Sequence, residues 1–160
     1  MSIQQGRTVS HSVVQMTELV LPSHTNALGT IFGGIIMSWV DIAAAICAQR
    51  HSSQPVVTAS IDALNFVAPV HLGWVVNLRA SLNYAGKTSM EVGVRVEAEN
   101  PITGEKFHTA SAYLTFVAIG SNGKPRAVSP VIAETPDEKR RFEAAQKRRT
   151  LRLEARNISK

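Results

Sequence analysis

The sequence is poor in cysteine and in long apolar runs. Cys47 is the one cysteine among 160 residues, so no disulfide can form within the chain. The longest run of uncharged, mainly apolar residues covers positions 31–40, includes two glycines and ends at Asp41. That run is too short to predict a membrane-spanning helix. The first residues, MSIQQGRTVSHS, lack the apolar core of a secretory signal. These absences favour a soluble cytoplasmic protein.

Patterns typical of metal sites and of serine nucleophiles are also missing. The five histidines, at positions 11, 24, 51, 71 and 108, have no spacing typical of zinc ligands, so we expect no metal site. No segment has the pattern of a nucleophile elbow. Cys47 has no neighbouring base in the sequence and lies in an apolar segment, which is typical of a packed core thiol.

Charge is unevenly distributed along the chain. The net charge is +5, and residues 137–160 hold nine basic and four acidic residues, whereas residues 1–136 hold eight of each. A general nucleic-acid binder would spread basic charge over a domain face, so we expect no nucleic-acid partner. Two basic clusters recur near helical spacing, at residues 139–141 and 147–149. They are either a solvated helix face or a phosphate site.

Hydrophobic patterning predicts one helix among several strands. Residues 8–20 alternate loosely and favour a strand, and residues 31–50 are long and apolar enough for a helix of five turns. Period-two alternation then predicts four strands, at residues 56–65, 74–84, 89–99 and 105–119. Turns at residues 85–87 and 100–104 indicate a meander, and a charged helix follows from Pro136 to about residue 156.

A helix that is apolar over most of its surface needs cover on most sides. One curved antiparallel sheet wrapped around it supplies that cover, which predicts an α+β fold of the hotdog type. We expect a single domain over residues 1–160, with the basic C-terminal helix at about 137–156. Such a sheet leaves an edge strand, and pairing through that edge would give a dimer.

The central helix carries a stripe of small residues at helical spacing: Gly34, Ser38, Asp41 and Ala45. The large residues beside the stripe are predicted to face the sheet: Ile35, Trp39, Ile42 and Ile46. Asp41 is the only charge on the stripe. A carboxylate on such a helix is either satisfied by nearby amides and hydroxyls or kept for function, and both interpretations remain open.

Glycines open this helix and also form a later turn. Gly33 and Gly34 could expose backbone N–H groups that stabilise an oxyanion, or they could simply permit tight backbone packing. The segment Gly86-Lys87-Thr88-Ser89 is similar to the end of a phosphate-binding loop. It lacks the glycine required at position 81 and precedes a strand instead of a helix, so we interpret it as a turn whose amides could face a ligand.

Several blocks together resemble the hotdog-fold acyl-coenzyme A thioesterases of the acyl-CoA hydrolase group. They are P-S-H-T-N-A-L-G-T-I-F-G-G-(x)6-D from Pro22 to Asp41, V-T-A-S-(x)5-F-(x)2-P-V-(x)2-G, G-K-T-S-M-E-V and F-V-A. Their order and number make the resemblance specific over roughly residues 8–150. One departure follows Gly73, where Trp74 replaces the acidic or polar residue usual in the family.

The resemblance implies hydrolysis of an acyl-CoA thioester without metal or other cofactor, coenzyme A being part of the substrate and product. It implies Asn26 and Asp41 as catalytic residues, with Asp41 as general base or nucleophile, and a backbone oxyanion site at Phe32, Gly33 and Gly34. The implied coenzyme A contacts are Gly86, Lys87, Thr88, Ser89, and basic residues of the tail such as Arg148 and Arg149. A dimer-based hexamer with shared active sites is implied, with no membrane partner.

Two other functions compete with hydrolysis. A hotdog dehydratase usually has a histidine on its helix, and here the first is His51, at the predicted helix end. The other alternative is a non-catalytic protein that binds acyl-CoA or a nucleotide, which would bind coenzyme A tightly without releasing thiol.

Overall fold

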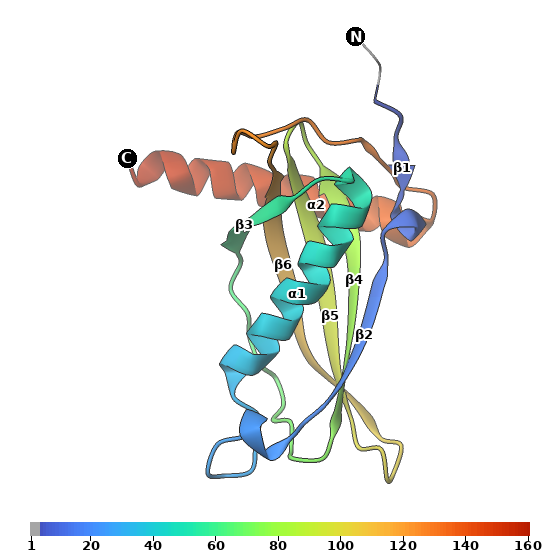
Figure 1. Ribbon diagram of the computed structural model, residues 1–160, viewed down its shortest axis with the longest axis vertical. Helices are drawn as coiled ribbons and strands as arrows, with labels where there is room; N and C mark the ends of the chain where they lie inside the picture. The colour runs from blue at the N-terminus through green and yellow to red at the C-terminus, as the bar shows by residue number, and fades with distance from the viewer. Residues whose placement is uncertain (1–3) are drawn as a thin grey trace.

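The computed structural model describes residues 4–160. A five-stranded antiparallel sheet curls around the helix α1 (Gly33–Ser52), and a second helix, α2 (Pro136–Ile158), crosses the opposite face (Figure 1). From edge to edge the strands are β2 (Val14–Leu19), β4 (Val75–Ala85), β5 (Ser89–Glu99), β6 (Lys106–Ala118) and β3 (Val56–Ile61). The short strands β1 (Arg7–Thr8) and β7 (Val131–Ile132) pair in parallel beside this sheet. Single turns of 3-10 helix lie at η1 (Val9–His11) and η2 (Pro22–His24). This is the predicted α+β hotdog fold.

The predicted elements are found with small shifts at their ends. The central helix begins after Phe32, and Ser53 ends it in the left-handed conformation at φ 54°. The predicted first strand, at residues 8–20, is broken by η1, so only β2 joins the large sheet. Trp74, the departure from the family pattern, stacks on Phe107 with ring centroids 5.7 Å apart.

The predicted meander of four strands is wrong at its first strand. β4, β5 and β6 follow one another as hairpins, but β3 pairs with β6 at the far edge of the sheet. The connection at residues 62–74 carries the chain from β3 at one edge to β4, the strand next to the opposite edge strand β2. β3 therefore has one paired side and one unpaired side, while β2 forms the second edge.

The rotation of α1 about its axis differs from the prediction at one large residue. The buried stripe that faces the sheet consists of Ile36, Val40, Ala43 and Cys47, at the spacing of one helix face. Trp39 is also buried, but Ile42 is 50% exposed and points away from the sheet. Because Ile36 and Val40 fill the sheet-facing positions, the small-residue stripe with Asp41 lies on the exposed side of α1.

The sequence of α2 explains where this helix begins and how little of it is buried. α2 begins with a capping box in which Thr135 and Glu138 satisfy each other's backbone N–H groups. Its one fully buried side chain is Ala145, and most of its surface is charged and exposed. No helix in residues 4–160 combines the length and the apolar character needed to cross a membrane.

Candidate active site

Asp41 and Thr58 meet on the exposed side of α1. The Thr58 hydroxyl, on edge strand β3, donates a hydrogen bond of 2.8 Å to Asp41 Oδ1. Asp41 is half-buried in the single chain, and Thr58 is exposed. Among residues 4–160 no hydrogen bond to Asp41 Oδ2 is present. One carboxylate oxygen is thus held in place while the other remains open to a ligand.

A β-bulge lies directly beside this pair. The register of β3 against β6 shifts between Thr58 and Ser60, so Ala59 has no direct partner. Bulges re-aim side chains and are common next to active sites. Exposed apolar side chains flank the pair on both elements: Met37 and Ile42 on α1, and Val57 and Ile61 on β3. Exposed apolar surface of this kind marks a contact with a ligand or another chain.

Asn26 shapes the loop that precedes α1. Its Oδ1 accepts hydrogen bonds from the backbone N–H groups of Leu28 at 2.9 Å and Thr30 at 3.2 Å, and its Nδ2 donates to Thr30 Oγ1 at 2.9 Å. Gly29 completes the turn at φ 76°, a conformation that glycine adopts readily. Within one chain the Asn26 side chain is therefore engaged by its own loop.

The glycine pair at the start of α1 combines the two interpretations left open by the sequence. A side chain at Gly33 would lie 3.3 Å from the Phe66 ring, whereas nothing lies within 4 Å of the corresponding position at Gly34. The Phe32 N–H donates to the His24 carbonyl at 3.0 Å. The first N–H groups of a helix have no intrahelical acceptor, so Gly33 and Gly34 are better placed than Phe32 to bind an oxyanion.

A single chain does not bring the glycine turn to Asp41. Asp41 follows Gly33 by eight positions along α1, which is about 12 Å at the rise of an α-helix. One thioester carbonyl cannot contact both at once. A second copy of the chain must therefore supply one of these groups if both act in a single site.

The segment from Gly86 to Ser89 is the tight turn between β4 and β5, as predicted. The Gly86 N–H donates to the Ser89 carbonyl at 2.8 Å, and the carbonyls of Lys87 and Thr88 accept hydrogen bonds from Val128 and Ala118. Arg149 lies near this turn, with its guanidinium 5.9 Å from the ring centroid of Tyr84. The structure thus brings Arg149 toward the predicted coenzyme A segment.

Arg148 has a different environment. Its Nη2 lies 2.7 Å from Oε1 of Glu91, its Nε donates to the same carboxylate at 3.2 Å, and its guanidinium stacks 3.7 Å above the Tyr113 ring. The Glu91 side chain is 1% exposed and also accepts from Arg152 at 2.9 Å. Arg148 therefore holds α2 on the sheet, and its Nε and Nη2 are engaged by Glu91.

Sequence reasoning missed the importance of Glu91. Burial raises the pKa of this carboxyl, but hydrogen bonds from Arg148, Asn83 and Arg152 outweigh that effect and hold the pKa below its usual value. Glu91 alternates with the apolar residues of β5 that face α1, so the pattern predicts that its side chain is exposed on the opposite face of the sheet. A helix from the end of the chain covers it, and no local pattern predicts that contact.

The remaining candidate groups of α1 lie in the core, away from Asp41. His51 is fully buried, its Nε2 lies 2.7 Å from the Ser129 carbonyl, and burial lowers its pKa. His51 therefore lies at the end of α1, in the core and not beside Asp41. Cys47 is also fully buried, and burial raises its pKa to about 11, which confirms a packed thiol. Within residues 4–160 no three His, Cys, Asp or Glu side chains gather as metal ligands.

Comparison with known proteins identifies the class. The family model for the thioesterase superfamily matches residues 28–105. An uncharacterized acyl-CoA thioester hydrolase from Bacillus subtilis, YkhA, is 41% identical over 86% of this chain and 80% of its own length. The mouse cytosolic acyl coenzyme A thioester hydrolase is 36% identical over 94% of this chain, which spans 40% of that longer protein. The chain belongs to the thioesterase superfamily and, within it, to the acyl-CoA thioester hydrolases.

Solved structures agree with this assignment. The crystal structure of an apo-hexameric acyl-CoA thioesterase superimposes with a TM-score of 0.91 at 42% identity, covering 94% of this chain and 97% of that one. An acyl-CoA hydrolase from Staphylococcus aureus, in complex with butyryl coenzyme A, coenzyme A and coenzyme A disulfide, gives 0.87 at 37% identity over 96% and 93%. Three mutants of that enzyme replace an asparagine, an aspartate and a threonine by alanine.

The three residues mutated in the Staphylococcus aureus enzyme have the same order and spacing as Asn26, Asp41 and Thr58. Asn26 and Asp41 were expected from the sequence, but Thr58 was not. The signal available for Thr58 was the V-T-A-S block that contains it. Its contact with Asp41 depends on how β3 lies against α1, which spacing alone does not predict.

Proposed function

We propose that this enzyme hydrolyses acyl-CoA to a free carboxylic acid and coenzyme A at a site built around Asp41. The observation that carries the proposal is the hydrogen bond from Thr58 to Asp41 on the exposed side of α1. Relatives named acyl-CoA thioester hydrolases support the choice of substrate. The reaction as proposed uses water, with no metal or other cofactor, and takes place in the cytoplasm, as in the cytosolic relative.

Asp41 acts as a general base or as a nucleophile. As a base it takes a proton from water, whose oxygen attacks the thioester carbon, and the C–S bond then breaks to release coenzyme A. As a nucleophile its oxygen attacks the same carbon, the C–S bond breaks to release the coenzyme A thiolate, which takes up a proton, and water then hydrolyses the resulting anhydride to the free acid and Asp41. In both cases Thr58 orients the carboxylate through Oδ1, and Oδ2 reacts.

The developing negative charge on the thioester oxygen is stabilised by the N–H groups of Gly33 and Gly34. Their position in the first turn of α1 supports this role because the helix N-terminus favours an anion. Asn26 binds the substrate or orients the water. The separation of about 12 Å between Gly33 and Asp41 along one helix supports a site shared by two copies.

Dimers form through the exposed apolar surface around β3 and α1 and assemble further into a hexamer. The unpaired side of β3 provides an edge for another strand. Hexameric structures of related thioesterases support the larger assembly. In this arrangement Asn26 and the glycine turn of one copy meet Asp41 and Thr58 of the other.

Coenzyme A is bound by the turn from Gly86 to Ser89 and by Arg149. The position of Arg149 over Tyr84, next to that turn, supports its contact with a phosphate group. Arg148 contributes by holding α2 in place, because Glu91 engages its guanidinium. The phosphate contacts proposed for the tail therefore centre on Arg149.

The direct test is thiol release from a series of acyl-CoA substrates from acetyl- to palmitoyl-CoA. A colorimetric thiol reagent suits this enzyme because Cys47, its single thiol, is fully buried. We expect catalytic release of coenzyme A from at least one member of the series. Tight binding of coenzyme A without turnover of any substrate would instead favour the non-catalytic alternative.

A further inference from the structure

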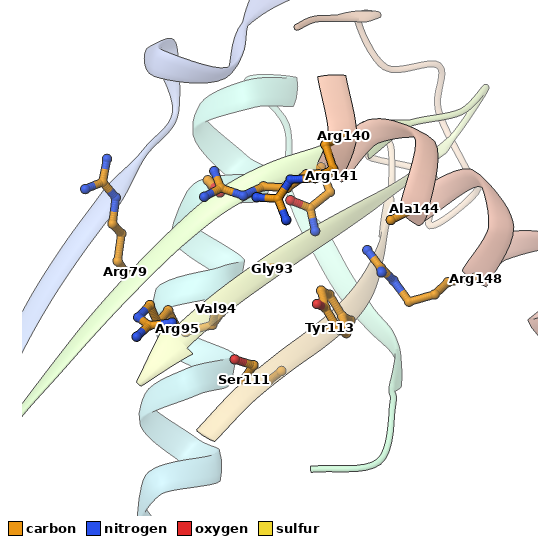
Figure 2. Close-up of a pocket in the computed structure, with 13 residues that line it drawn as sticks. Arg79, Gly93, Val94, Arg95, Ser111, Tyr113, Arg140, Arg141, Ala144 and Arg148 are labelled. Carbon is orange, nitrogen blue, oxygen red and sulfur yellow. The ribbon is translucent and has the colours of Figure 1, made fainter. Parts of the chain in front are cut away.

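A cavity lies on the face of the sheet opposite α1. It has a volume of about 320 Å³ and is enclosed by β4, β5, β6 and the first half of α2 (Figure 2). Five arginines line it: Arg79, Arg95, Arg140, Arg141 and Arg148. Within the part of the chain that the structure describes, no acidic residue is among the lining residues. The sheet separates this cavity from the side on which Asp41 and Thr58 lie.

Two of these arginines face each other across neighbouring strands. Arg79 of β4 is the direct partner of Arg95 of β5 in the strand register. Like charges opposite one another destabilise an antiparallel pair. Glu97 offsets the charge of Arg95 in part through an exposed contact of 3.2 Å, but Arg79 has no acidic partner within residues 4–160. The sheet therefore keeps two positive charges side by side, which a bound anion would neutralise.

α2 contributes further positive charge to the cavity from the side opposite the sheet. Figure 2 shows Arg140 and Arg141 extending from α2 over the strands. Arg140 pairs with Asp137 at 3.1 Å, but both side chains are 70% exposed, and exposed pairs of this kind are weak. Arg141 has no acidic partner in the described part of the chain. Charge that the protein leaves unpaired thus converges on one cavity from two elements.

Polar side chains and a glycine form the floor of the cavity. Ser81, Gly93 and Tyr113 lie in one row across β4, β5 and β6. A side chain at Gly93 would approach the Asn83 amide nitrogen to 2.7 Å, and Asn83 donates a hydrogen bond to Glu91 at 3.0 Å. Glycine at this position therefore keeps the floor open and leaves the Glu91 network intact. Hydroxyl and amide groups complement the arginines as donors to an oxyanion.

We propose that this cavity binds an anion with two or more phosphate groups. Guanidinium groups bind phosphate oxygens through paired N–H donors, and Arg79 and Arg141 offer such donors free of acidic partners from opposite sides. The cavity is of the size of small-ligand sites, which begin at about 300 Å³. The phosphates come either from the coenzyme A portion of a substrate or from a free oligophosphate, and this site is separate from the thioester site.

The experiment measures binding of inorganic pyrophosphate, and of coenzyme A, by titration calorimetry at low salt. The variants are Arg79→Gln and Arg141→Gln, which remove one unpaired charge each. Arg156→Gln is the matched control, because Arg156 also lies on α2 but does not line the cavity. We expect wild type and Arg156→Gln to bind pyrophosphate equally. Each of the two cavity variants should weaken binding by about tenfold, the effect of losing one charged hydrogen-bonded contact.

The source of the phosphates is distinguished by kinetics. If coenzyme A supplies them, Arg79→Gln raises KM for acyl-CoA with little change in kcat, and pyrophosphate competes with the substrate. If a free oligophosphate is the ligand, KM is unchanged and pyrophosphate binds equally well in the presence of saturating coenzyme A. Either result supports the site.

Three results would overturn it. One is equal pyrophosphate binding by wild type and both cavity variants, and another is no binding by wild type. The third is loss of the oligomer in Arg79→Gln without any anion binding, which would make the cavity an interface between copies. Thiol release is measured in the same preparations, so a failure of this proposal leaves the proposed hydrolysis separately tested.

Discussion

Thr58 and Asp41 are joined by a hydrogen bond of 2.8 Å between an edge strand and the central helix. In the sequence, the last turns of α1 and a short turn lie between Asp41 and Thr58. The bulge at Ala59 lies directly beside the contact. The bond leaves the second oxygen of Asp41 without a partner in residues 4–160. Substitutions of Asp41 and Thr58 test what this hydrogen bond contributes.

Asp41→Asn should keep the fold and lose turnover. The amide keeps the size of the side chain and can still bond Thr58, but it cannot take a proton or attack a thioester. We expect the rate of thiol release to fall by at least about 100-fold, the usual contribution of a general base. Melting temperature and oligomer size serve as controls. Turnover at the wild-type rate in pure Asp41→Asn would contradict the proposed mechanism.

Thr58 should act through its hydroxyl. Thr58→Val removes the donor while preserving the branched shape of the side chain, and we expect kcat to fall by about tenfold, as for one lost hydrogen bond to a charged group. Thr58→Ser keeps the donor and should retain most of the activity. Equal activities of the serine and valine variants would show that the hydroxyl has no part in the reaction.

Mixing inactive variants should reveal whether sites are shared. Asn26→Ala and Asp41→Asn each disable one half of the proposed composite site. A mixed dimer contains one site with both defects and one site with neither, so exchange of subunits should restore part of the activity. The measurement is thiol release after exchange verified by mass spectrometry of tagged chains. Verified exchange without any recovery would place Asn26 and Asp41 of one chain in the same site.

Glu91 should contribute strongly to stability. Its carboxylate is buried and bonded to Arg148 and Arg152, and breaking a buried pair costs about 3 kcal/mol or more. We expect Glu91→Gln to lower the free energy of unfolding by about that amount in urea denaturation. Glu97→Gln is the matched control on the same strand, because its pair with Arg95 is exposed and worth about 0.5 kcal/mol. Equal effects of both substitutions would contradict this account.

Stability should decrease in mild acid because of His51. Burial lowers the pKa of this imidazole in the folded state, whereas in the unfolded chain its pKa has the usual value of about 6.5. The unfolded state therefore binds more protons below that pH, and stability falls as pH decreases through the lowered folded pKa. Urea denaturation between about pH 5 and 8 measures this slope.

The control for this pH dependence is a histidine on the surface. His51→Gln should flatten the slope because it removes the buried titrating group, while His108→Gln, at an exposed position, should retain it. A slope unchanged in His51→Gln would assign the pH dependence to other groups.

Local sequence patterns predicted most of the elements because alternation and helical spacing are local properties. β5 begins and ends where the alternation predicted, and α1 is displaced by only two residues at each end. The position of β3 was not predictable in this way, because pairing with β6 depends on the path of a long connection. The exposure of Ile42 was missed for a related reason, since packing against the sheet decides how α1 is rotated.

In the candidate site too, local sequence patterns predicted individual residues but not the contacts between distant segments. Asp41 stood out because a charge on an apolar helix is unusual, and Asn26 came from the family resemblance. Thr58 was one threonine among several until the fold placed it against Asp41. The charge of Arg148 predicted a phosphate contact, but its guanidinium bonds Glu91, a residue distant in sequence that the docking of α2 brings close.

The C-terminal helix contacts the edge of the sheet at β3, although it lies on the face opposite α1. Arg152 of α2 bonds Asp62 at 2.8 Å, and Asp62 directly follows β3, the strand that carries Thr58. α2 therefore holds the end of β3 in place from the outer face of the sheet, and β3 in turn carries the Thr58 hydroxyl that bonds Asp41. Sequence changes that loosen this contact would act on turnover from a distance, with no altered group near the thioester.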